Sequence, residues 1–420
     1  MSKVVIVGGG FGGLNAAKAL GGSRHDVWLI DKTNHHLFQP LLYQVASAAL
    51  SPGDIAVPIR EILSPYENIT VLMGEVTAID KQKRIVVLKN GDCIGFDYLI
   101  LSVGARHSYF GKDEWEQYAP GLKTLSDALK IRERILISFE KAERCDSITE
   151  AKQYLNFVIV GGGPTGAEMA GAIAEIAYET MLKNFRRIDV TKTKIYLVEG
   201  SPHILPVYPE SLSIKAEQYL DHFGVKVITG KRVTNISSQG VEVEGNLIPA
   251  HNILWAAGNQ AAPLLKTLEC PLDKQGRAQV ESDLSIPDHP HIFVIGDAAC
   301  AIDKKGKPLP ALAPVAVQQG RYVAKLIRKE LPKSARPPFS YLDKGTMATI
   351  GKTKAIGTFG QIKFHGFLAW LAWCFVHILY LIGFRNRIIV LGQWLFSYFT
   401  SKRGVRLVYR SVDEEFPTKR

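Results

Sequence analysis

The sequence predicts an α/β protein with two parallel-sheet domains. Two segments carry this prediction, and they read VVIVGGGFGG at residues 4–13 and FVIVGGGPTG at residues 157–166. In each segment, a continuous apolar run of the kind that forms a buried parallel strand leads into closely spaced glycines and then into a helical pattern. Each is followed by a further apolar run that ends in an acid, at Asp31 and at Glu199.

The glycines of these two turns have the spacing that a bound dinucleotide requires. The first glycine permits a tight turn, the second lets a pyrophosphate approach the backbone, and the third lets the helix pack against the strand. The phosphates lie at the helix N-terminus, and the acid accepts hydrogen bonds from the ribose hydroxyls. We therefore predict two Rossmann-like domains. Two dinucleotides bound to one chain suggest electron transfer from one to the other.

The first domain continues through further strand patterns. Apolar β-branched runs at residues 69–72 and 85–88 predict strands, and Asn90-Gly91 predicts a hairpin turn after the second of them. Residues 97–105 predict another buried strand, which leaves the sheet through Gly104.

A helix predicted over residues 126–144 connects to the second domain. Glu199 lies further from its glycines than the usual ~20 residues. Residues 167–187 are helical in character, so we predict a lengthened crossover helix at that point. Residues 251–258 predict the strand that closes this domain, which we place at residues 116–279.

A third strand-to-turn pattern occurs at residues 291–299 and contains Gly296-Asp297. If this strand returns to the first sheet, the first domain is discontinuous, with residues 1–115 and 280–345, and the second domain is inserted within it. A helix with a proline-rich start follows at residues 309–329 and ends before Pro332.

The C-terminal region, residues 346–420, changes in character. Residues 364–384 contain no Asp, Glu, Lys or Arg, and a bilayer span needs about 20 apolar residues. A transmembrane helix, a buried hairpin and an in-plane membrane anchor are all compatible with this segment. Its tryptophans and tyrosines favour the in-plane anchor, because amphipathic rings prefer the membrane interface. Basic residues border the apolar segments and suit a phospholipid surface: Arg385, Arg387, Lys402, Arg403, Arg406 and Arg410.

Charge and cysteine usage exclude several other classes of protein. The formal net charge is +11, but many of the cations lie in this C-terminal region, which favours an anionic lipid surface over nucleic acid. The five cysteines form no CxxC or CxxxxC pair, so we expect free thiols, a reducing compartment and no metal site. The first strand begins at Lys3, which leaves no room for a signal peptide.

Three segments give the chain a more specific resemblance. They are HLFQPLLYQVA at residues 36–46, GGGPTGAE at residues 161–168, and the apolar stretch with its arginines at residues 367–387. The chain resembles the flavoproteins with two dinucleotide-binding domains and, within them, the type II NADH dehydrogenases (NADH:quinone oxidoreductases). The resemblance covers essentially the whole chain. One departure is in the quinone-site segment, where this family commonly has Ala-Gln-x-Ala-x-Gln and residues 313–318 read APVAVQ, so that Pro314 replaces the first glutamine.

This resemblance implies hydride transfer from NADH to FAD and then two-electron reduction of a membrane quinone, without proton pumping. It also implies a respiratory enzyme associated with the cytoplasmic face of the bacterial inner membrane. Two alternatives stay open. One is another enzyme of the same fold, such as a sulfide:quinone oxidoreductase or a different FAD-dependent NAD(P)H oxidoreductase. The other is a membrane-bound flavoprotein that acts as a redox sensor. The sequence leaves open which quinone is used and whether the chain forms a homodimer.

The expected site residues follow from the turns and from the resemblance. For FAD we predict Gly8, Gly10, Phe11, Gly12, Gly13, Asp31, Lys32, Val76, Gly104, Asp297 and Ala313. For NADH we predict Gly161, Gly163, Pro164, Thr165, Gly166, Glu199 and Gly258. The resemblance makes Glu168 and Gln318 the catalytic candidates, Glu168 beside the nicotinamide and flavin rings and Gln318 at the quinone. No arginine directly follows Glu199, which favours NADH over NADPH.

Structural alternatives exist for several of these residues. Lys32 could be a solvated surface lysine, Val76 an ordinary strand residue, and Asp297 a helix N-cap. Glu168 could be a first-turn acid that favours the helix dipole. Gln39, Pro40 and Tyr43 either shape the flavin pocket or serve turns and packing. His35 and His36 have no acid or cysteine partner at ligand spacing, so we interpret them as structural.

Overall fold

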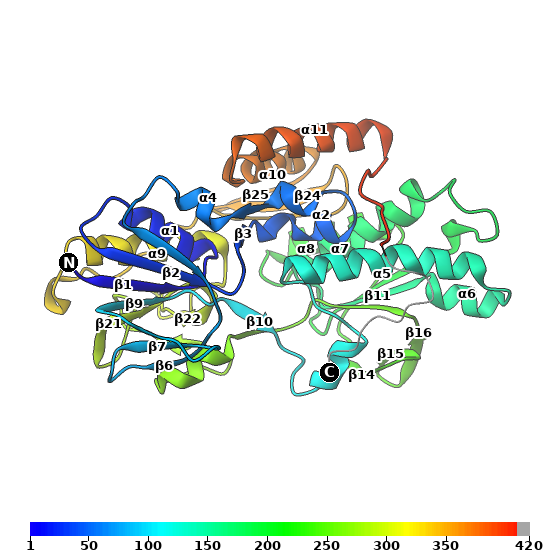
Figure 1. The fold of residues 1–420 in the computed structure, drawn as a ribbon. Coiled ribbons are helices and arrows are strands. Elements are labelled where there is room, and N and C mark those ends of the chain that lie inside the picture. The colour runs from blue at the N-terminus through cyan, green and yellow to red at the C-terminus, as the bar shows by residue number, and fades with distance from the viewer. Residues whose placement is uncertain (410–420) are drawn as a thin grey trace. The chain divides into compact units, whose positions relative to one another are not determined.

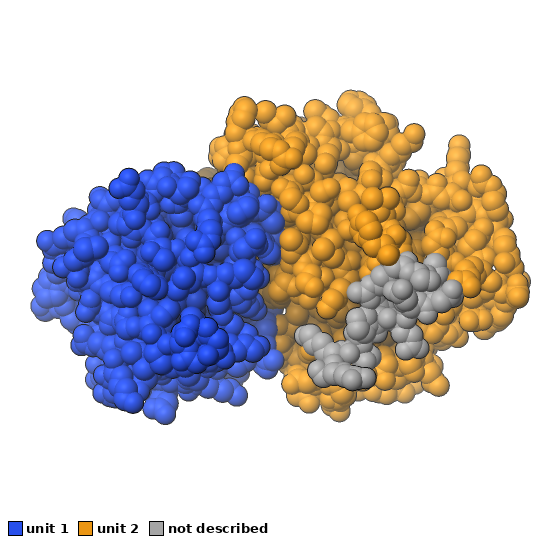
Figure 2. All heavy atoms as spheres, viewed as in Figure 1, with its two compact units in different colours: residues 1–37, 56–106, 259–343 blue, residues 38–55, 107–258, 344–420 orange. Residues whose placement is uncertain are grey.

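The computed structural model describes residues 1–409, so Arg410 lies outside the described residues. The chain divides into two compact units (Figure 2). Of the described residues, unit 1 contains 1–37, 56–106 and 259–343, and unit 2 contains 38–55, 107–258 and 344–409.

Unit 1 is built on a six-stranded sheet whose order is β20-β21-β9-β1-β2-β5 (Figure 1). All neighbouring strands are parallel except β20 and β21. The central strand β1 is almost completely buried because its VVIV run is apolar on both faces. The strands are β1 (Lys3–Val7), β2 (Asp26–Asp31), β5 (Ile69–Met73), β9 (Tyr98–Leu101), β20 (Ser285–Ile286) and β21 (His289–Val294).

Strand β21 confirms that the third strand pattern returns to the first sheet. It pairs in parallel with β9, with Ile292 opposite Leu99 and Val294 opposite Leu101. Unit 1 is therefore discontinuous in sequence. The helix that follows, α9 (Ala313–Arg328), packs against α1 (Phe11–Leu20), and Pro314 lies in its first turn, where the missing N–H has no helical partner.

Smaller elements complete unit 1. The predicted hairpin is present, because β7 (Ile85–Leu88) and β8 (Cys93–Gly95) are antiparallel and Gly91 between them has φ +92°. Residues 259–279, which fall in the predicted second domain, belong to unit 1. The boundaries of the two units therefore differ from those of the predicted domains. Three further strand pairs, one added strand and one short helix complete unit 1, although the last residue of β10 is counted in unit 2: β3 (His35–Leu37), β4 (Ala56–Pro58), β6 (Val76–Asp80), β10 (Ala105–His107), β18 (Asn259–Ala261), β19 (Ala278–Gln279), β22 (Ala299–Cys300) and α4 (Ile59–Leu63).

Unit 2 is built on a four-stranded parallel sheet whose order is β13-β12-β11-β17. Its long helix α5 (Leu125–Arg144) begins with a capping box between Thr124 and Asp127, which agrees with the predicted connecting helix. The other elements of this part are β11 (Asn156–Val160), β12 (Lys194–Val198), β13 (Val225–Ile228), β17 (Asn252–Trp255), α6 (Ile148–Tyr154), α8 (Glu210–His222) and the antiparallel β14 (Val233–Ser237), β15 (Gly240–Val243) and β16 (Asn246–Pro249).

The crossover helix after β11 is shorter than predicted. Helix α7 spans Pro164–Glu175 and continues as one π-helical turn over Ile176–Thr180. The chain beyond it is irregular apart from a short turn of helix at Val190–Lys192. The helical composition of residues 181–187 did not extend the helix, because tertiary contacts override weak local propensity.

The C-terminal region of unit 2 forms a three-stranded antiparallel sheet and two helices. The helices are α10 (Phe367–Tyr380) and α11 (Phe384–Thr400), which lie side by side in Figure 1. The uncharged segment 364–384 is therefore divided between a strand, α10 and the start of α11. Within residues 1–409, no helix combines the length and apolarity that crossing a membrane requires. The strands are β23 (Thr346–Thr349), β24 (Ala355–Phe359) and β25 (Ile362–Gly366).

Candidate functional site

The first glycine turn leaves room for a ligand at one glycine and none at the others. Gly8 has φ +101°, and a Cβ there would lie 2.3 Å from Ser102 O. A Cβ on Gly13 would lie 1.8 Å from Gly8 O, so only glycine lets α1 approach β1 this closely. A Cβ on Gly10, in contrast, would meet nothing within 4 Å. Gly10 precedes the N-terminus of α1, so this open space lies where the helix dipole and free backbone N–H groups favour a pyrophosphate.

Asp31 is fixed at the end of β2, next to this turn. Its Oδ2 accepts a hydrogen bond from Gly9 N at 2.6 Å, and its Oδ1 accepts from Thr33 N at 2.7 Å. A carboxylate has about four acceptor positions, so Asp31 keeps acceptor capacity for a ribose hydroxyl. The neighbouring Lys32 is exposed.

Residues from the third segment of unit 1 support the same turn. A Cβ on Gly320 would lie 2.2 Å from Gly12 O, so α9 and α1 touch backbone to backbone there. Gln319 is buried, and its Oε1 accepts from Gly296 N at 2.7 Å, which holds the Gly296-Asp297 turn at the end of β21. Ala313 begins α9. The structure therefore brings the predicted residues Gly12, Asp297 and Ala313 together within unit 1.

His36 is buried and holds the glycine turn from another side. Its Nδ1 lies 3.0 Å from Gly9 O, and its ring meets Phe11 edge-on with 5.2 Å between ring centroids. Burial lowers the pKa of His36, so the ring is neutral at pH 7 and its Nδ1–H donates to the carbonyl. This contact has the structural character that we predicted for His36.

The second glycine turn repeats the first in unit 2. Gly161 has φ +108°, and a Cβ there would lie 2.6 Å from the backbone of Ala256. A Cβ on Gly166 would lie 1.9 Å from Gly161 O, whereas a Cβ on Gly163 would meet nothing within 4 Å. Pro164 then occupies the first turn of α7. The open position again precedes a helix N-terminus, so this turn can also take a pyrophosphate.

Glu199 lies next to the glycine turn of unit 2, as Asp31 lies next to the glycine turn of unit 1. Its Oε2 accepts from Gly162 N at 2.6 Å and its Oε1 accepts from Ser201 N at 2.7 Å. The fold also brings the exposed side chain of Arg232 close to Glu199, which the sequence did not indicate. The Cγ atom of Arg232 lies 3.4 Å from where a Cβ on Gly200, the residue after Glu199, would be. Arg232 follows β13, far from Glu199 in the chain.

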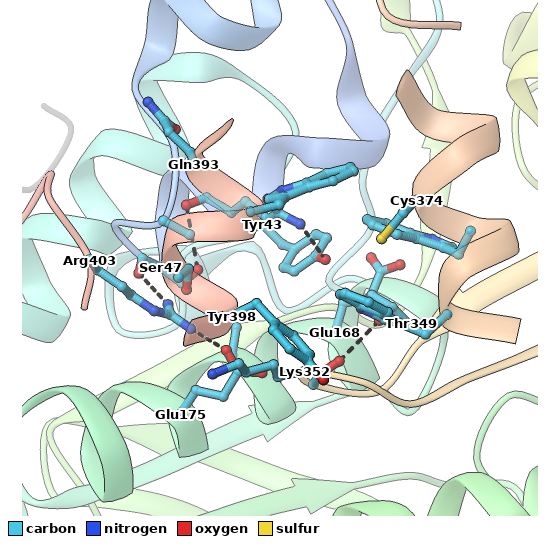
Figure 3. A pocket seen from close by; sticks show the side chains of 18 residues that line it. Tyr43, Ser47, Glu168, Glu175, Thr349, Lys352, Cys374, Gln393, Tyr398 and Arg403 are labelled. Carbon is cyan, nitrogen blue, oxygen red and sulfur yellow. Dashed lines mark hydrogen bonds and ion pairs between the residues drawn. The ribbon is translucent and has the colours of Figure 1, made fainter. Parts of the chain in front are cut away.

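A cavity of about 80 Å³ lies within unit 2 (Figure 3). Its walls come from the N-terminal part of the chain, from α7, from the β23–β24 turn, and from both C-terminal helices. The lining residues are Tyr43, Gln44, Ser47, Ala49, Glu168, Ala172, Glu175, Thr349, Gly351, Lys352, Trp370, Trp373, Cys374, Gln393, Trp394, Ser397, Tyr398 and Arg403. Five of these residues are aromatic and nine are polar or charged, so the cavity combines flat apolar walls with converging polar groups, as sites for small organic molecules do.

Glu168 projects from α7 toward this cavity. The first turn of α7 contains no acid, so Glu168 is not the first-turn acid of the structural alternative. Burial raises the pKa of Glu168 to about 8, although a hydrogen bond from the backbone N–H of Thr349 lowers it. At pH 7 the carboxyl group is therefore mainly protonated, and it can donate a proton into the cavity.

A chain of hydrogen bonds connects α11 to Tyr43. Trp394 Nε1 donates to Gln44 Oε1 at 2.7 Å, and Gln44 Nε2 donates to the Tyr43 hydroxyl at 2.8 Å. Burial, reinforced by Glu168, raises the pKa of Tyr43 well above its ordinary value. The phenol therefore stays protonated and can donate its own hydrogen.

Arg403 corrects one sequence expectation. We expected it to face phospholipid with Lys402 and Arg406, but its side chain is buried with only 4% exposed. It donates to Glu175 Oε2 at 2.5 Å and to Ser47 O at 2.5 Å. The physical reason is that a buried carboxylate and two cavity walls supply the partners that a desolvated guanidinium needs.

Gln318 is not among the residues that line this cavity. The side-chain amide of Gln318 makes two hydrogen bonds with the backbone of Leu342. Its Nε2 donates to Leu342 O at 3.0 Å, and its Oε1 accepts from Leu342 N at 3.0 Å. The structure thus ties this side chain to the last segment of unit 1. Of the remaining predicted residues, Val76 is buried in β6 and Gly104 and Gly258 both have positive φ.

Sequence reasoning missed several residues of these sites. Trp394, Gln44, Thr349, Glu175 and Arg403 reach the cavity from segments that are far apart in the chain. The one available signal was Glu175, which lies seven residues after Glu168 and so falls on the same face of a helix.

Comparisons with known proteins cover nearly the whole chain. The family model for pyridine nucleotide-disulphide oxidoreductases matches residues 2–320, and the NDH2 C-terminal domain matches residues 344–403. The chain is 42% identical to type II NADH:quinone oxidoreductase Ndh of Mycobacterium tuberculosis, over 96% of this chain and 89% of the relative. It is 29% identical to the type II NADH:quinone oxidoreductase of Staphylococcus haemolyticus, over 84% of this chain and 89% of the relative.

Solved structures share the fold at low identity. A structure of NDH2 from Plasmodium falciparum in complex with NADH has a TM-score of 0.89, with 20% identity over 96% of this chain and 99% of that one. The sulfide:quinone oxidoreductase of Aquifex aeolicus has a TM-score of 0.73, with 19% identity over 96% of both chains.

Proposed function

The chain belongs to the type II NADH:quinone oxidoreductases, within the pyridine nucleotide-disulphide oxidoreductase family, and on this premise we propose which of its residues hold each reactant. The turn at Gly8–Gly13 binds FAD, the turn at Gly161–Gly166 binds NADH, and the cavity beside Glu168 takes the quinone ring. The observation that carries the last assignment is a proton-bearing carboxyl group in an aromatic-walled cavity formed with the C-terminal helices.

The residues of unit 1 fit a flavin dinucleotide. The open space at Gly10 accommodates a pyrophosphate, and Asp31 keeps acceptor capacity for the adenosine ribose. Asp297, on a turn held by Gln319, would bind the ribityl and pyrophosphate region. When bound, FAD supplies the two-electron chemistry that no side chain of the protein can supply.

The residues of unit 2 favour NADH over NADPH. Glu199 accepts from the ribose hydroxyls, and its negative charge repels a 2′-phosphate. Its carboxylate is already held by two backbone N–H groups, so its position does not depend on the ligand.

Glu168 and Tyr43 supply the proton chemistry at the quinone. Reduction of a quinone by NADH consumes one proton in addition to the hydride, so a proton must reach a quinone oxygen. Glu168 carries a proton at neutral pH, and Tyr43 offers a second O–H near the same cavity. The five aromatic side chains of the lining favour a flat apolar ring. Gln318 stays a quinone-site candidate on the resemblance alone, since it does not line this cavity and its amide is bound to Leu342.

The C-terminal helices attach the protein to an anionic membrane surface in this proposal. Large apolar side chains stand exposed along both helices, among them Leu368, Phe375, Phe384 and Phe399 at 69–79% exposure. A helix with such a face lies in the interfacial plane of a bilayer, and neighbouring cations strengthen its attachment to anionic lipid. We place this surface on the cytoplasmic side of a bacterial inner membrane, with no proton pumping.

A thiol mechanism of the sulfide-oxidising kind has no support at this cavity. Cys374 lines the cavity, but burial raises the pKa of its thiol to about 12. A thiol that stays protonated at neutral pH is a poor nucleophile. Replacement of Cys374 by serine with retained quinone reduction would separate the two mechanisms.

The test of the proposed function is NADH oxidation by the FAD-loaded protein with a short-chain quinone, beside NADPH and a disulfide acceptor. Fast quinone reduction that is selective for NADH is the expected result. Flavin reduction by NADH without quinone turnover would overturn the cavity assignment and would favour the sensor alternative.

A further inference from the structure

Helix α11 forms one wall of the cavity but buries few of its residues. Gln393, Trp394, Ser397 and Tyr398 of this helix line the cavity, whereas only Asn386 and Val390 of α11 are buried. The outer face of the helix is exposed and apolar. The position of this wall must therefore depend on a small number of specific contacts.

Some of these contacts come from Trp394 and Tyr398 within the helix, and a second group lies just beyond its end. Ser401 has a left-handed conformation, φ +54°, which turns the chain back toward the body of unit 2. Thr180 Oγ1 then donates to Ser401 O at 3.1 Å, and Lys352 Nζ donates to Ser401 Oγ at 3.1 Å. Two residues later, Arg403 enters the protein.

Arg403 is the most deeply buried cation of this segment, and both residues that accept hydrogen bonds from its guanidinium line the cavity. One nitrogen donates to Ser47 O and the other to Glu175 Oε2, both at 2.5 Å. Ser47 is 356 residues away and Glu175 is 228 residues away in the chain. A planar guanidinium fork can hold two acceptors at fixed angles, which a lysine ammonium does not do.

Glu175 links this contact to the reacting end of the cavity. It lies seven residues after Glu168 on α7, about two helical turns along the same face, and both carboxyl groups line the cavity (Figure 3). The Arg403 contact thus connects the segment that follows α11 to the helix that carries Glu168.

We propose that Arg403 is a positioning residue for quinone reduction: by joining Ser47 to Glu175 it holds α11 against α7 and so determines how closely the quinone ring approaches Glu168. This inference rests on the proposed function, because it takes the cavity as the quinone site. Arg403 lines the cavity, but its guanidinium is engaged with Ser47 and Glu175, so its effect in the proposal passes through the position of the α11 wall.

The primary test is Arg403→Met in the full-length, FAD-loaded protein. The expected result is a rise in the quinone KM and a fall in kcat/KM for quinone on the order of 10- to 100-fold, because small misplacements of reacting groups have effects of that size. The rate at which NADH bleaches the flavin, and the reduction of ferricyanide, should stay near the wild-type values. Arg403→Lys should recover part of the loss only, since it restores the charge but not the fork.

A double variant separates positioning from stability. Arg403→Met alone leaves Glu175 buried without a cation, which destabilises a fold. Glu175→Gln combined with Arg403→Met removes both charges, so we expect its Tm to recover toward wild type. The quinone KM should stay raised in the double variant, since the link across the cavity is still missing. Recovery of the quinone KM together with the Tm would overturn the inference and make the pair purely structural.

The matched control is Arg187→Met. Arg187 also pairs with a carboxylate, Asp146, at 2.7 Å, but this pair is exposed and neither residue lines the cavity. We expect unchanged quinone kinetics for this variant. An equal quinone KM in Arg403→Met and wild type would refute the positioning role while leaving the proposed function intact. Absence of quinone reduction in the wild-type protein would instead refute the proposed function.

Discussion

The carboxylate of Glu199 accepts a hydrogen bond from the backbone N–H of Gly162, with 2.6 Å between Oε2 and N. The acid that would choose the nicotinamide dinucleotide is therefore also part of the turn that would hold its pyrophosphate. Asp31 and Gly9 repeat the contact in unit 1, also at 2.6 Å.

Glu199→Gln should weaken the binding of NADH and improve the binding of NADPH. The variant loses the negative charge that repels a 2′-phosphate, and Arg232 beside Gly200 then supplies a cation for that phosphate. Hydrogen bonds to charged groups contribute about 1.5–3 kcal/mol, so we expect kcat/KM for NADH to fall roughly 10- to 100-fold. Steady-state kinetics with both nucleotides checks this. In Glu199→Gln combined with Arg232→Met, the gain with NADPH should disappear, and its persistence would contradict the role of Arg232.

Gly10→Ala should affect FAD binding, whereas Gly13→Ala should affect folding. An added methyl at Gly10 meets no protein atom, whereas one at Gly13 meets Gly8 O at 1.8 Å. We expect Gly10→Ala to fold with a near-wild-type Tm as apoprotein but to retain less FAD, because the methyl occupies the pyrophosphate space. Gly13→Ala should lower the Tm or prevent folding. Flavin content per chain and apoprotein Tm give the two readings, and full FAD retention by Gly10→Ala would place the pyrophosphate elsewhere.

Glu168→Gln should remove a pH dependence. In the wild-type protein the carboxyl is protonated below a pKa of about 8 and ionised above it, so kcat/KM for quinone should fall as the pH rises through that value. The amide cannot donate a proton, so the variant should be slower below pH 8 and should lack this alkaline limb. A pH profile of both proteins tests this, and an identical limb in the variant would assign the titration to another group.

The same carboxyl predicts a stability effect with a definite sign. Because burial raises its folded-state pKa from 4.5 to about 8, the folded state binds more protons than the unfolded state between these values. Stability then falls as the pH rises across that window. The difference in Tm between Glu168→Gln and wild type should therefore shift in favour of the variant between pH 5 and pH 9. Thermal unfolding of both proteins at the two pH values would show this shift.

The turns could be predicted from the sequence because their chemistry is local. The shape of each turn depends on glycines within ten residues and on an acid one strand later, so Gly8, Gly13, Gly161 and Gly166 have the tight contacts that their spacing predicts. The same local reasoning predicted a crossover helix that is too long, because the residues after Thr180 have a helical composition but leave the helix where tertiary contacts override that weak propensity.

The cavity could not be predicted in this way because its contacts are long-range. Gln44 and Trp394 are hydrogen-bonded across 350 residues of sequence, and nothing in either neighbourhood indicates the other. Arg403 illustrates the consequence. In sequence it belongs to a basic cluster that suits lipid, and only the fold supplies the buried carboxylate that draws it inside.

Trp394→Phe should raise the quinone KM several-fold with little change in flavin reduction. The variant keeps an aromatic ring but loses the N–H that donates to Gln44, and Gln44 in turn orients the Tyr43 hydroxyl. A neutral hydrogen bond contributes about 0.5–1.5 kcal/mol, which corresponds to roughly 2- to 12-fold. Trp28→Phe is the control, because Trp28 Nε1 donates to Asp26 at 2.9 Å in unit 1. Equal effects of the two substitutions on quinone KM would refute a specific role for Trp394.

Phe375→Ser and Phe399→Ser should weaken attachment to vesicles that contain anionic lipid. Both side chains are largely exposed, at 69% and 79%, and burial of a phenylalanine side chain in an apolar phase contributes about 1.5–3 kcal/mol. Each substitution should therefore lower the vesicle partition constant on the order of tenfold or more, without lowering the Tm, since the rings have few partners in the protein. Phe110→Ser is the control, because Phe110 is 70% exposed but lies outside α10 and α11. If co-sedimentation with vesicles falls equally in Phe110→Ser, the apolar faces of the two C-terminal helices are not the attachment surface.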